Sequence, residues 1–144
     1  MSKLTVVNQA LGLIGEPAIF ALTENSSSAR LIEQHYEPCL AHLLASHAFR
    51  FALEVATLQL DATATPFPRF TTVFHRPQSA LRIIELTDGY GNTIEYKESK
   101  GHLHTAVDSP ITVTYTVQVP IEDTSPLFRT AFACYLATQL VVHT

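Results

Sequence analysis

Histidines are the residues of this sequence best suited to chemistry, because a neutral imidazole ligates metals and exchanges protons near neutral pH. The chain has seven of them. His102 and His104 are two residues apart, so on a strand both would face one side and could chelate an ion, with Asp108 as the nearest further ligand. A solvated pair of turn histidines is the simpler interpretation. We therefore predict no metal site and no cofactor.

Carboxylates and thiols give no clearer catalytic pattern. Glu33 and Glu37 are four residues apart, so on a helix they would be two solvated charges or, alternatively, a working carboxylate pair. Cys39 and Cys134 are expected to be small core residues rather than activated thiols. The sequence has no G-x-S-x-G nucleophile turn and no G-x-G-x-x-G phosphate loop. We expect no catalytic residues and a protein that is not an enzyme.

Composition narrows the class of protein. A chain of 144 residues predicts a single domain, here residues 1–144. The apolar fraction of 47% and the charged fraction of 15% favour a surface partly covered by subunit contacts. A net charge of −4 with nine scattered Lys and Arg residues excludes a basic stripe that would grip phosphates. No stretch is long and apolar enough to span a membrane, and the N-terminus lacks the pattern of a signal peptide.

Three segments carry the apolar periodicity of a helix, at about residues 3–14, 27–47 and 126–142. Gly15 and Pro17 predict the end of the first helix, and Pro38 predicts a kink or a local break in the second. In the loop after the first helix, Ile19, Phe20 and Leu22 are expected to turn inward.

The region between the second and third helices, about residues 49–119, has the two-residue period of strands. Apolar residues alternate at Phe49, Phe51 and Leu53, and further short strands are predicted at 70–74, 81–86, 93–96 and 111–117. Turn residues at 88–92 and 99–101 lie between the last three of these strands. The predicted fold is α+β: a small helical bundle with an antiparallel β meander inserted between helices 2 and 3.

The last helix has a start signal and no stop signal. Ser125 is a good N-cap and Pro126 suits the first helical position, but no Gly, Asn or Pro follows Leu140, Val141 and Val142. An apolar last turn has to be buried, either against a continuation of the chain or against another molecule. We therefore expect these three residues to lie in an interface.

Several segments together resemble the head-to-tail adaptor family of short-tailed bacteriophages, also called the tail tubular protein A family. They are ALGLIGEPAI, SARLIEQHYEPCLAHLLASHAFRFA, RPQSALRIIEL and SPLFRTAFACYLATQLV, which occur in the family's order over nearly the whole chain. The chain departs from the family at residues 48–52, where AFRFA stands in place of a Trp-bearing PWNFA. Family members also tend to continue beyond the last helix, which would explain the missing stop signal.

The resemblance implies a structural role in the virion. Such proteins form a ring, typically a dodecamer, between the portal protein of the capsid and the tail nozzle protein, and they are assembled in the host cytoplasm. DNA passes through the lumen without sequence-specific binding, and a mildly acidic wall would let the phosphate backbone slide past.

The loop of residues 63–70 is a further candidate contact with a neighbouring subunit, the portal or the tail. Its Phe67 and Phe70 would either be exposed in an interface or fold back onto the sheet. Two other functions remain open from the sequence: a tail-associated cell-wall hydrolase that uses Glu33 or Glu37, and a small α+β binding module unrelated to phage.

Overall fold

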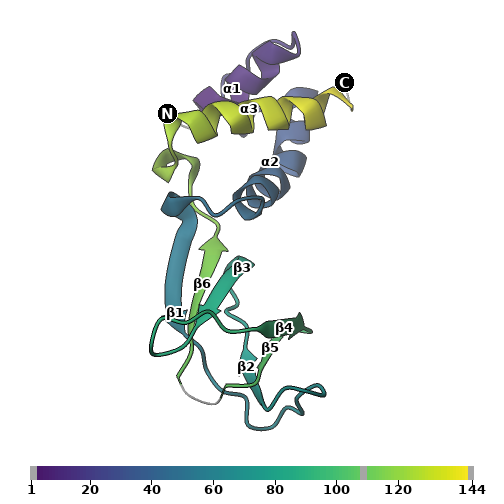
Figure 1. Ribbon diagram of the computed structural model, residues 1–144. Helices are drawn as coiled ribbons and strands as arrows, with labels where there is room; N and C mark the ends of the chain where they lie inside the picture. The colour runs from purple at the N-terminus through teal and green to yellow at the C-terminus, as the bar shows by residue number, and fades with distance from the viewer. Residues whose placement is uncertain (1–2, 108–109, 143–144) are drawn as a thin grey trace. The chain divides into compact units, whose positions relative to one another are not determined.

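The computed structural model describes residues 3–107 and 110–142. Over these residues the chain forms three α-helices and two antiparallel sheets of three strands each, so the α+β class is confirmed (Figure 1). The helices are α1 (Lys3–Leu13), α2 (Ser27–Ala45) and α3 (Pro126–Val141). The strands are β1 (Leu53–Thr57), β2 (Thr72–His75), β3 (Ala80–Thr87), β4 (Tyr96–Ser99), β5 (His102–Thr105) and β6 (Thr112–Val117). None of the helices in the described ranges is long and apolar enough to cross a bilayer.

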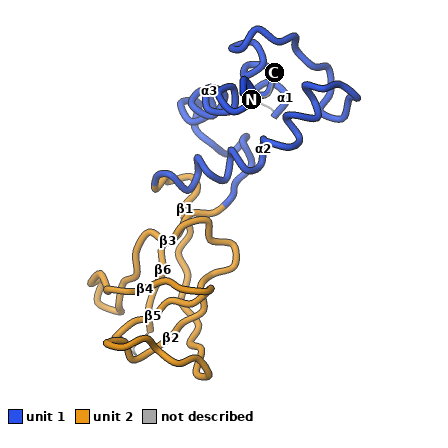
Figure 2. Tube along the Cα trace, turned by 90° about the vertical axis from the view of Figure 1, so that its right-hand side faces the viewer, with its two compact units in different colours: residues 1–47, 118–144 blue, residues 48–117 orange. Residues whose placement is uncertain are grey.

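The chain divides into two compact units where the sequence predicted one domain (Figure 2). The helical unit comprises residues 3–47 and 118–142 of the described chain, and the β unit comprises Ala48–Val117. The boundaries of the β unit lie within two residues of the predicted insertion at 49–119.

Helix α3 is the centre of the helical unit, since it packs against both α1 and α2. Phe132, Leu136 and Leu140 of α3 are at most 1% exposed. Their partners include a stripe on α1 and a stripe on α2 that are also buried: Val6, Val7, Ala10 and Leu11; Ala29, Ile32, Tyr36, Cys39, Leu40 and Leu44. The helical unit therefore has its own apolar core.

Two serines start the longer helices as their positions predict. The Ser26 hydroxyl accepts a hydrogen bond from the Ala29 N–H, and the Ser125 hydroxyl accepts one from the Phe128 N–H. Of the kink or local break predicted at Pro38, the break does not form, since α2 continues through this residue to Ala45. Proline removes only one backbone hydrogen bond, and the burial of Tyr36 and Cys39 on either side of it holds the helix together.

The loop after α1 is only partly folded inward. Ile19 is buried, and its backbone is held by Asn8: the Ile19 N–H donates to Asn8 Oδ1 over 2.8 Å, and Asn8 Nδ2 donates to the Ile19 carbonyl over 3.1 Å. Phe20 does not turn inward and is 95% exposed. The expectation for Phe20 was wrong because the clamp fixes Ile19 toward α1, and the next side chain then points away.

The β unit contains two sheets instead of the single predicted meander. One sheet has the order β1-β6-β3 and the other the order β2-β5-β4. In a meander each strand pairs with the next one along the chain, whereas here β6 pairs with both β1 and β3. Prolines at 66, 68 and 77 lie in the connections around β2 and lack the N–H needed to extend a ladder, which favours distant partners.

Among the strands of the described residues, only β4 and β5 form a tight hairpin. Lys100 and Gly101 connect them and both have positive φ angles, 51° and 78°. Two consecutive positive φ angles are the mark of a type I′ turn, whose twist matches that of the strands. The predicted turn at 99–101 is thus confirmed.

The predicted strand at Phe49 begins later than expected. Residues Arg50–Ala52 form a short 3₁₀ turn, and β1 starts at Leu53. The rings of Phe49 and Phe51 stack at 5.4 Å instead of pointing along one face of a sheet. Aromatic residues two apart therefore mark a turn here rather than the alternation of a strand.

Candidate functional site

The three residues predicted to form an interface at the end of α3 differ in their exposure. Leu140 is 1% exposed and belongs to the core of the helical unit, whereas Val141 and Val142 are 52% and 76% exposed. Leu140 follows Leu136 by one helical turn, so it lies on the same buried face, and the next two residues fall outside that face. Val141 and Val142 are therefore the members of the predicted set whose side chains are exposed.

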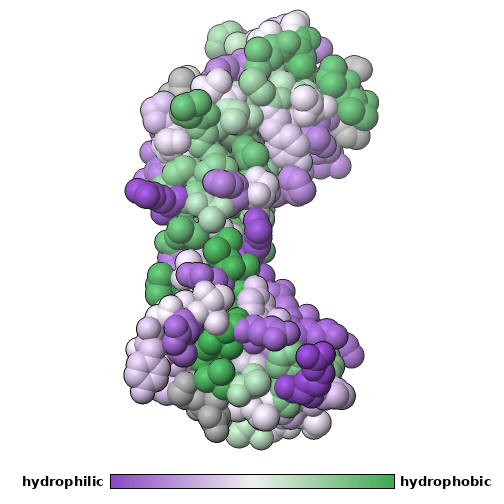
Figure 3. Space-filling view, in the orientation of Figure 1, coloured by the Kyte–Doolittle hydropathy of each residue, from purple (hydrophilic) through white to green (hydrophobic). Residues whose placement is uncertain are grey.

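Other large apolar side chains are exposed on the same unit. They are Leu13 at the end of α1, Phe20 in the loop after it, and Leu127 in the first turn of α3. Apolar side chains gather over the part of the helical unit where α3 ends (Figure 3). A contiguous patch of exposed apolar side chains is typical of a protein contact surface. We call Leu13, Phe20, Leu127, Val141 and Val142 the apolar surface set.

The aromatic loop of the β unit folds back onto its sheet. The Phe67 ring stacks on His104 of β5 with centroids 4.0 Å apart, and Lys97 Nζ lies 5.1 Å from the Phe67 centroid. Phe67 and Phe70 are half-buried and line one hollow together with Glu95, Tyr96 and Lys97. Of the two interpretations of these phenylalanines, packing on the sheet is the one that the geometry favours.

The residues considered for catalysis do not converge. Glu33 and Glu37 are both exposed on α2, and they line different hollows. Glu37 accepts a hydrogen bond from Gln118 Nε2 over 2.9 Å and lies 3.8 Å from Lys3 Nζ. No hollow among those described holds both carboxylates in the manner of a hydrolase pair.

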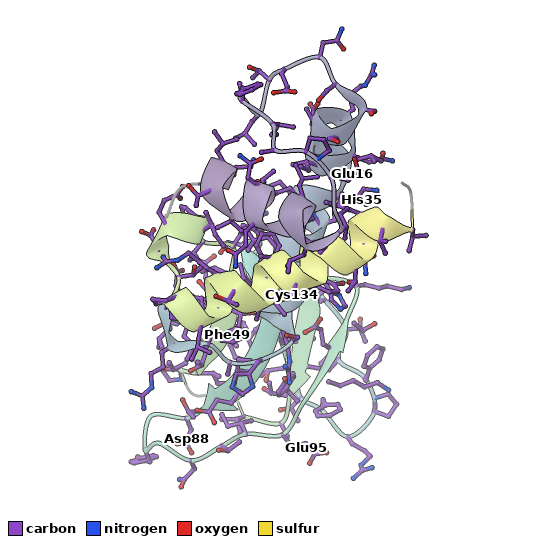
Figure 4. The ribbon with its side chains drawn as sticks, turned by 90° about the horizontal axis from the view of Figure 1, so that it is seen from above. Glu16, His35, Phe49, Asp88, Glu95 and Cys134 are labelled. Atoms are coloured by element: carbon purple, nitrogen blue, oxygen red, sulfur yellow. The ribbon has the colours of Figure 1, made fainter. Side chains whose placement is uncertain are left out.

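The two cysteines are free thiols in different surroundings. Cys39 is buried as expected, and burial raises its pKa, which keeps the thiol protonated and unreactive. Cys134 is exposed on α3 and is not the core residue that was expected (Figure 4). The buried face of α3 includes Phe132, Ala133 and Leu136. Cys134 lies on the opposite face of the helix, which is exposed.

A group that the sequence did not predict lies in the β unit. Asp61, His75 and His102 bring one ligand atom each to within 4.8 Å of one another. His102 Nε2 donates a hydrogen bond to Asp61 Oδ2 over 2.9 Å, and His75 Nε2 lies 3.9 Å from the same oxygen. This arrangement of two imidazoles and one carboxylate is able to hold a divalent transition metal.

Strand pairing explains why these three residues meet. His75 and His102 are directly opposite in the antiparallel pair of β2 and β5. The segment before Thr63 runs along the other edge of β2. There the Asp61 N–H donates a hydrogen bond to the Val73 carbonyl over 2.8 Å. All three side chains therefore share one face of the sheet.

His104, the partner that the sequence spacing suggested for His102, has a different role. It is buried, and its Nδ1 accepts a hydrogen bond from the Phe67 N–H over 3.3 Å. Burial lowers the pKa of His104 and keeps its ring neutral. Asp108, the third ligand considered from the sequence, lies outside the described residues.

No protein-family model and no curated protein sequence matches the chain. The candidate sites therefore stand on the geometry of the residues themselves.

Proposed function

We propose that this protein is a structural subunit of a bacteriophage head-to-tail adaptor, forming a ring between the portal and the tail nozzle through which DNA passes. The observation that carries the proposal is the apolar surface set on a helical unit that already has a complete core. Side chains of this kind gain free energy when a second molecule covers them, at roughly 25 cal/mol for each Å² of apolar surface removed from water.

The positions of these residues suit a ring subunit. Leu127 lies in the first turn of α3 and Val141 at its last residue, so the helix rise of about 1.5 Å per residue separates them by roughly 21 Å. A subunit in a ring contacts its two neighbours through two different patches. Apolar residues at both ends of one helix supply such a pair of patches.

The net negative charge of the chain also supports a channel through which DNA passes without being bound tightly. The chain has 13 acidic and nine basic residues. A protein that binds DNA tightly neutralises several phosphates with clustered Lys and Arg, which this composition does not offer. A ring of such subunits would surround a duplex and let it move.

Light scattering coupled to size-exclusion chromatography tests the proposal, with the protein alone and mixed with the portal protein of the same phage. We expect a ring-sized species, in the mixture or in both samples. Leu127→Asp and Val142→Asp should each reduce its yield, because a charge in an apolar contact has to be desolvated. Thr138→Asp is the matched control, since it adds the same charge at an exposed polar position of α3.

A protein that stays monomeric both alone and with its portal would refute the proposal. Peptidoglycan cleavage that is lost in Glu33→Gln or Glu37→Gln would indicate the hydrolase instead.

A further inference from the structure

We propose that Asp61, His75 and His102 form a binding site for a divalent transition metal, with Zn²⁺ as the ion it favours. The site lies wholly within the β unit and does not depend on the proposed adaptor function. It would tie three neighbouring stretches of chain together: the segment that precedes Thr63, strand β2 and strand β5.

The separations of the ligand atoms fit a zinc ion after small side-chain movements. Zinc binds nitrogen and oxygen at about 2.0–2.2 Å in tetrahedral geometry, which places its ligand atoms roughly 3.3 Å apart. Asp61 Oδ2 is 2.9 Å from His102 Nε2 and 3.9 Å from His75 Nε2. The first of these separations has to open by a few tenths of an ångström and the second has to close by about half an ångström to reach that value. Rotation of the His75 ring, whose side chain is 54% exposed, can supply much of this movement.

The carboxylate is already oriented by groups behind it. The N–H and the hydroxyl of Thr63 both donate to Asp61 Oδ1, over 3.0 and 2.7 Å, which leaves Oδ2 to face the two imidazoles. These hydrogen bonds, together with the one from His102 and the nearby His75, lower the pKa of Asp61 to about 2. Hydrogen bonds of this kind fix the direction of metal-binding side chains and commonly raise affinity.

Arg76 follows His75 in the sequence, and its positive charge is bonded to groups other than Asp61. The guanidinium of Arg76, the residue after His75, bonds to Glu98 Oε2 over 3.2 Å and to the Ala80 carbonyl over 2.8 Å. Asp61 Oδ2 is therefore engaged only by histidine among the contacts of the described chain. Because neutral histidine carries its proton on either ring nitrogen, His102 can move that proton to Nδ1 and offer the Nε2 lone pair to the ion.

The ligand types select the class of metal. Imidazole nitrogen suits zinc, copper and nickel, whereas magnesium and calcium prefer ligand sets made of oxygen alone. Three protein ligands leave a fourth position, and His75 also borders a surface hollow lined by Thr57, Gln59 and Gly101. Water can enter from that hollow and complete the coordination.

Isothermal titration calorimetry of the full chain with Zn²⁺ tests the site, using protein that carries no histidine tag. We expect one ion per chain, a melting temperature that rises with Zn²⁺, and a tetrahedral absorption spectrum when Co²⁺ replaces Zn²⁺. His75→Ala and His102→Ala should each weaken binding by about tenfold or more, since each removes a ligand. His42→Ala is the matched control, because it removes an exposed histidine from the helical unit.

Circular dichroism without metal shows whether each variant is folded. His75→Ala removes a side chain that is more than half exposed, so it remains a valid test even if His102→Ala unfolds. No binding at Zn²⁺ well above the protein concentration would overturn the proposal. So would binding that is unchanged in both His75→Ala and His102→Ala, or Mg²⁺ binding as tight as that of Zn²⁺.

Discussion

Tyr36 of α2 and Phe132 of α3 meet edge to face, with ring centroids 5.2 Å apart and ring planes at 85°. Phe132 is fully buried and Tyr36 nearly so. An edge-to-face pair is worth about 0.5–1.5 kcal/mol beyond the apolar area that it buries. This contact therefore joins two of the three helices at the centre of the helical unit.

Phe132→Ala should lower the free energy of unfolding by about 3–5 kcal/mol, because it removes the buried ring and leaves a cavity between the helices. Urea denaturation followed by circular dichroism measures the change. Leu127→Ala is the control on the same helix. Leu127 is 82% exposed, so its loss should change stability by no more than about 0.5 kcal/mol. Equal effects of the two substitutions would contradict the packing described here.

Asn8→Ala should lower the free energy of unfolding by about 1–3 kcal/mol, because it leaves the N–H and the carbonyl of the buried residue Ile19 without their partner. Asn8→Asp keeps the acceptor for the Ile19 N–H and loses the donor, so it separates the two bonds. Chemical denaturation and hydrogen exchange at the Ile19 amide give the result. An unchanged exchange rate in Asn8→Ala would show that burial of Ile19 alone holds the loop.

Ser125→Ala should cost about 1 kcal/mol, because the hydroxyl that accepts from the Phe128 N–H at the start of α3 is lost. Ser125→Asp keeps an acceptor and adds a negative charge at the positive end of the helix dipole, so its stability should match or exceed that of the natural protein. Thermal melts of the three proteins at neutral pH compare them. No loss of stability in Ser125→Ala would show that the cap contributes nothing.

The β unit should lose stability in acid when the carboxylate of Asp88 becomes protonated. Its Oδ1 accepts hydrogen bonds from the Tyr90 and Asn92 N–H groups over 2.8 and 3.0 Å, and these bonds lower the pKa of Asp88 below its ordinary value of 3.8. Because the folded state holds the carboxylate ionised, the stabilisation is present above pH 3.8 and is lost as pH falls through the lower folded pKa.

Asp88→Asn keeps one oxygen acceptor and removes the charge, so the difference in unfolding free energy between Asp88→Asn and the natural protein should shrink between about pH 5 and pH 3. Urea titrations at several pH values measure that difference. Glu95→Gln, at another exposed carboxylate of the β unit (Figure 4), is the control. A difference that does not change with pH would contradict the role of the charge.

The helices could be predicted because their signals are local. Ser125 and Pro126 mark the start of α3, and Phe128, Phe132 and Leu136 follow at helical spacing and are buried. The helical spacing also predicts Ala131 and Tyr135 on this face, but Ala131 is exposed and Tyr135 is half-buried, and Ala133, Ala137 and Leu140 are buried instead. The reason is that α3 packs against two helices, and the sequence of one helix does not state how many neighbours it has.

The sheets were only partly predictable. In β6, Val113, Tyr115 and Val117 alternate with threonines in the sequence, and all three are buried. The pairing of β6 with β1 joins Leu53 to Thr116, 63 residues along the chain, and no local pattern encodes that choice.

The histidine and aspartate group was missed for the same reason. Asp61 and His102 are 41 residues apart, and only the register of three neighbouring stretches places them on one face. His102 was noticed through its spacing from His104, which the fold uses for packing against Phe67. Residues close in sequence were an unreliable guide to residues close in space.

The pairing of β1 with β6 means that the β unit begins and ends with adjacent strands. A segment whose two ends meet can be removed or exchanged without stretching the chain on either side of it. The helical unit thus carries its 70-residue insertion as a replaceable cassette between residues 47 and 118. Evolution or an engineer can swap that cassette for another of different length while the three-helix core keeps its sequence.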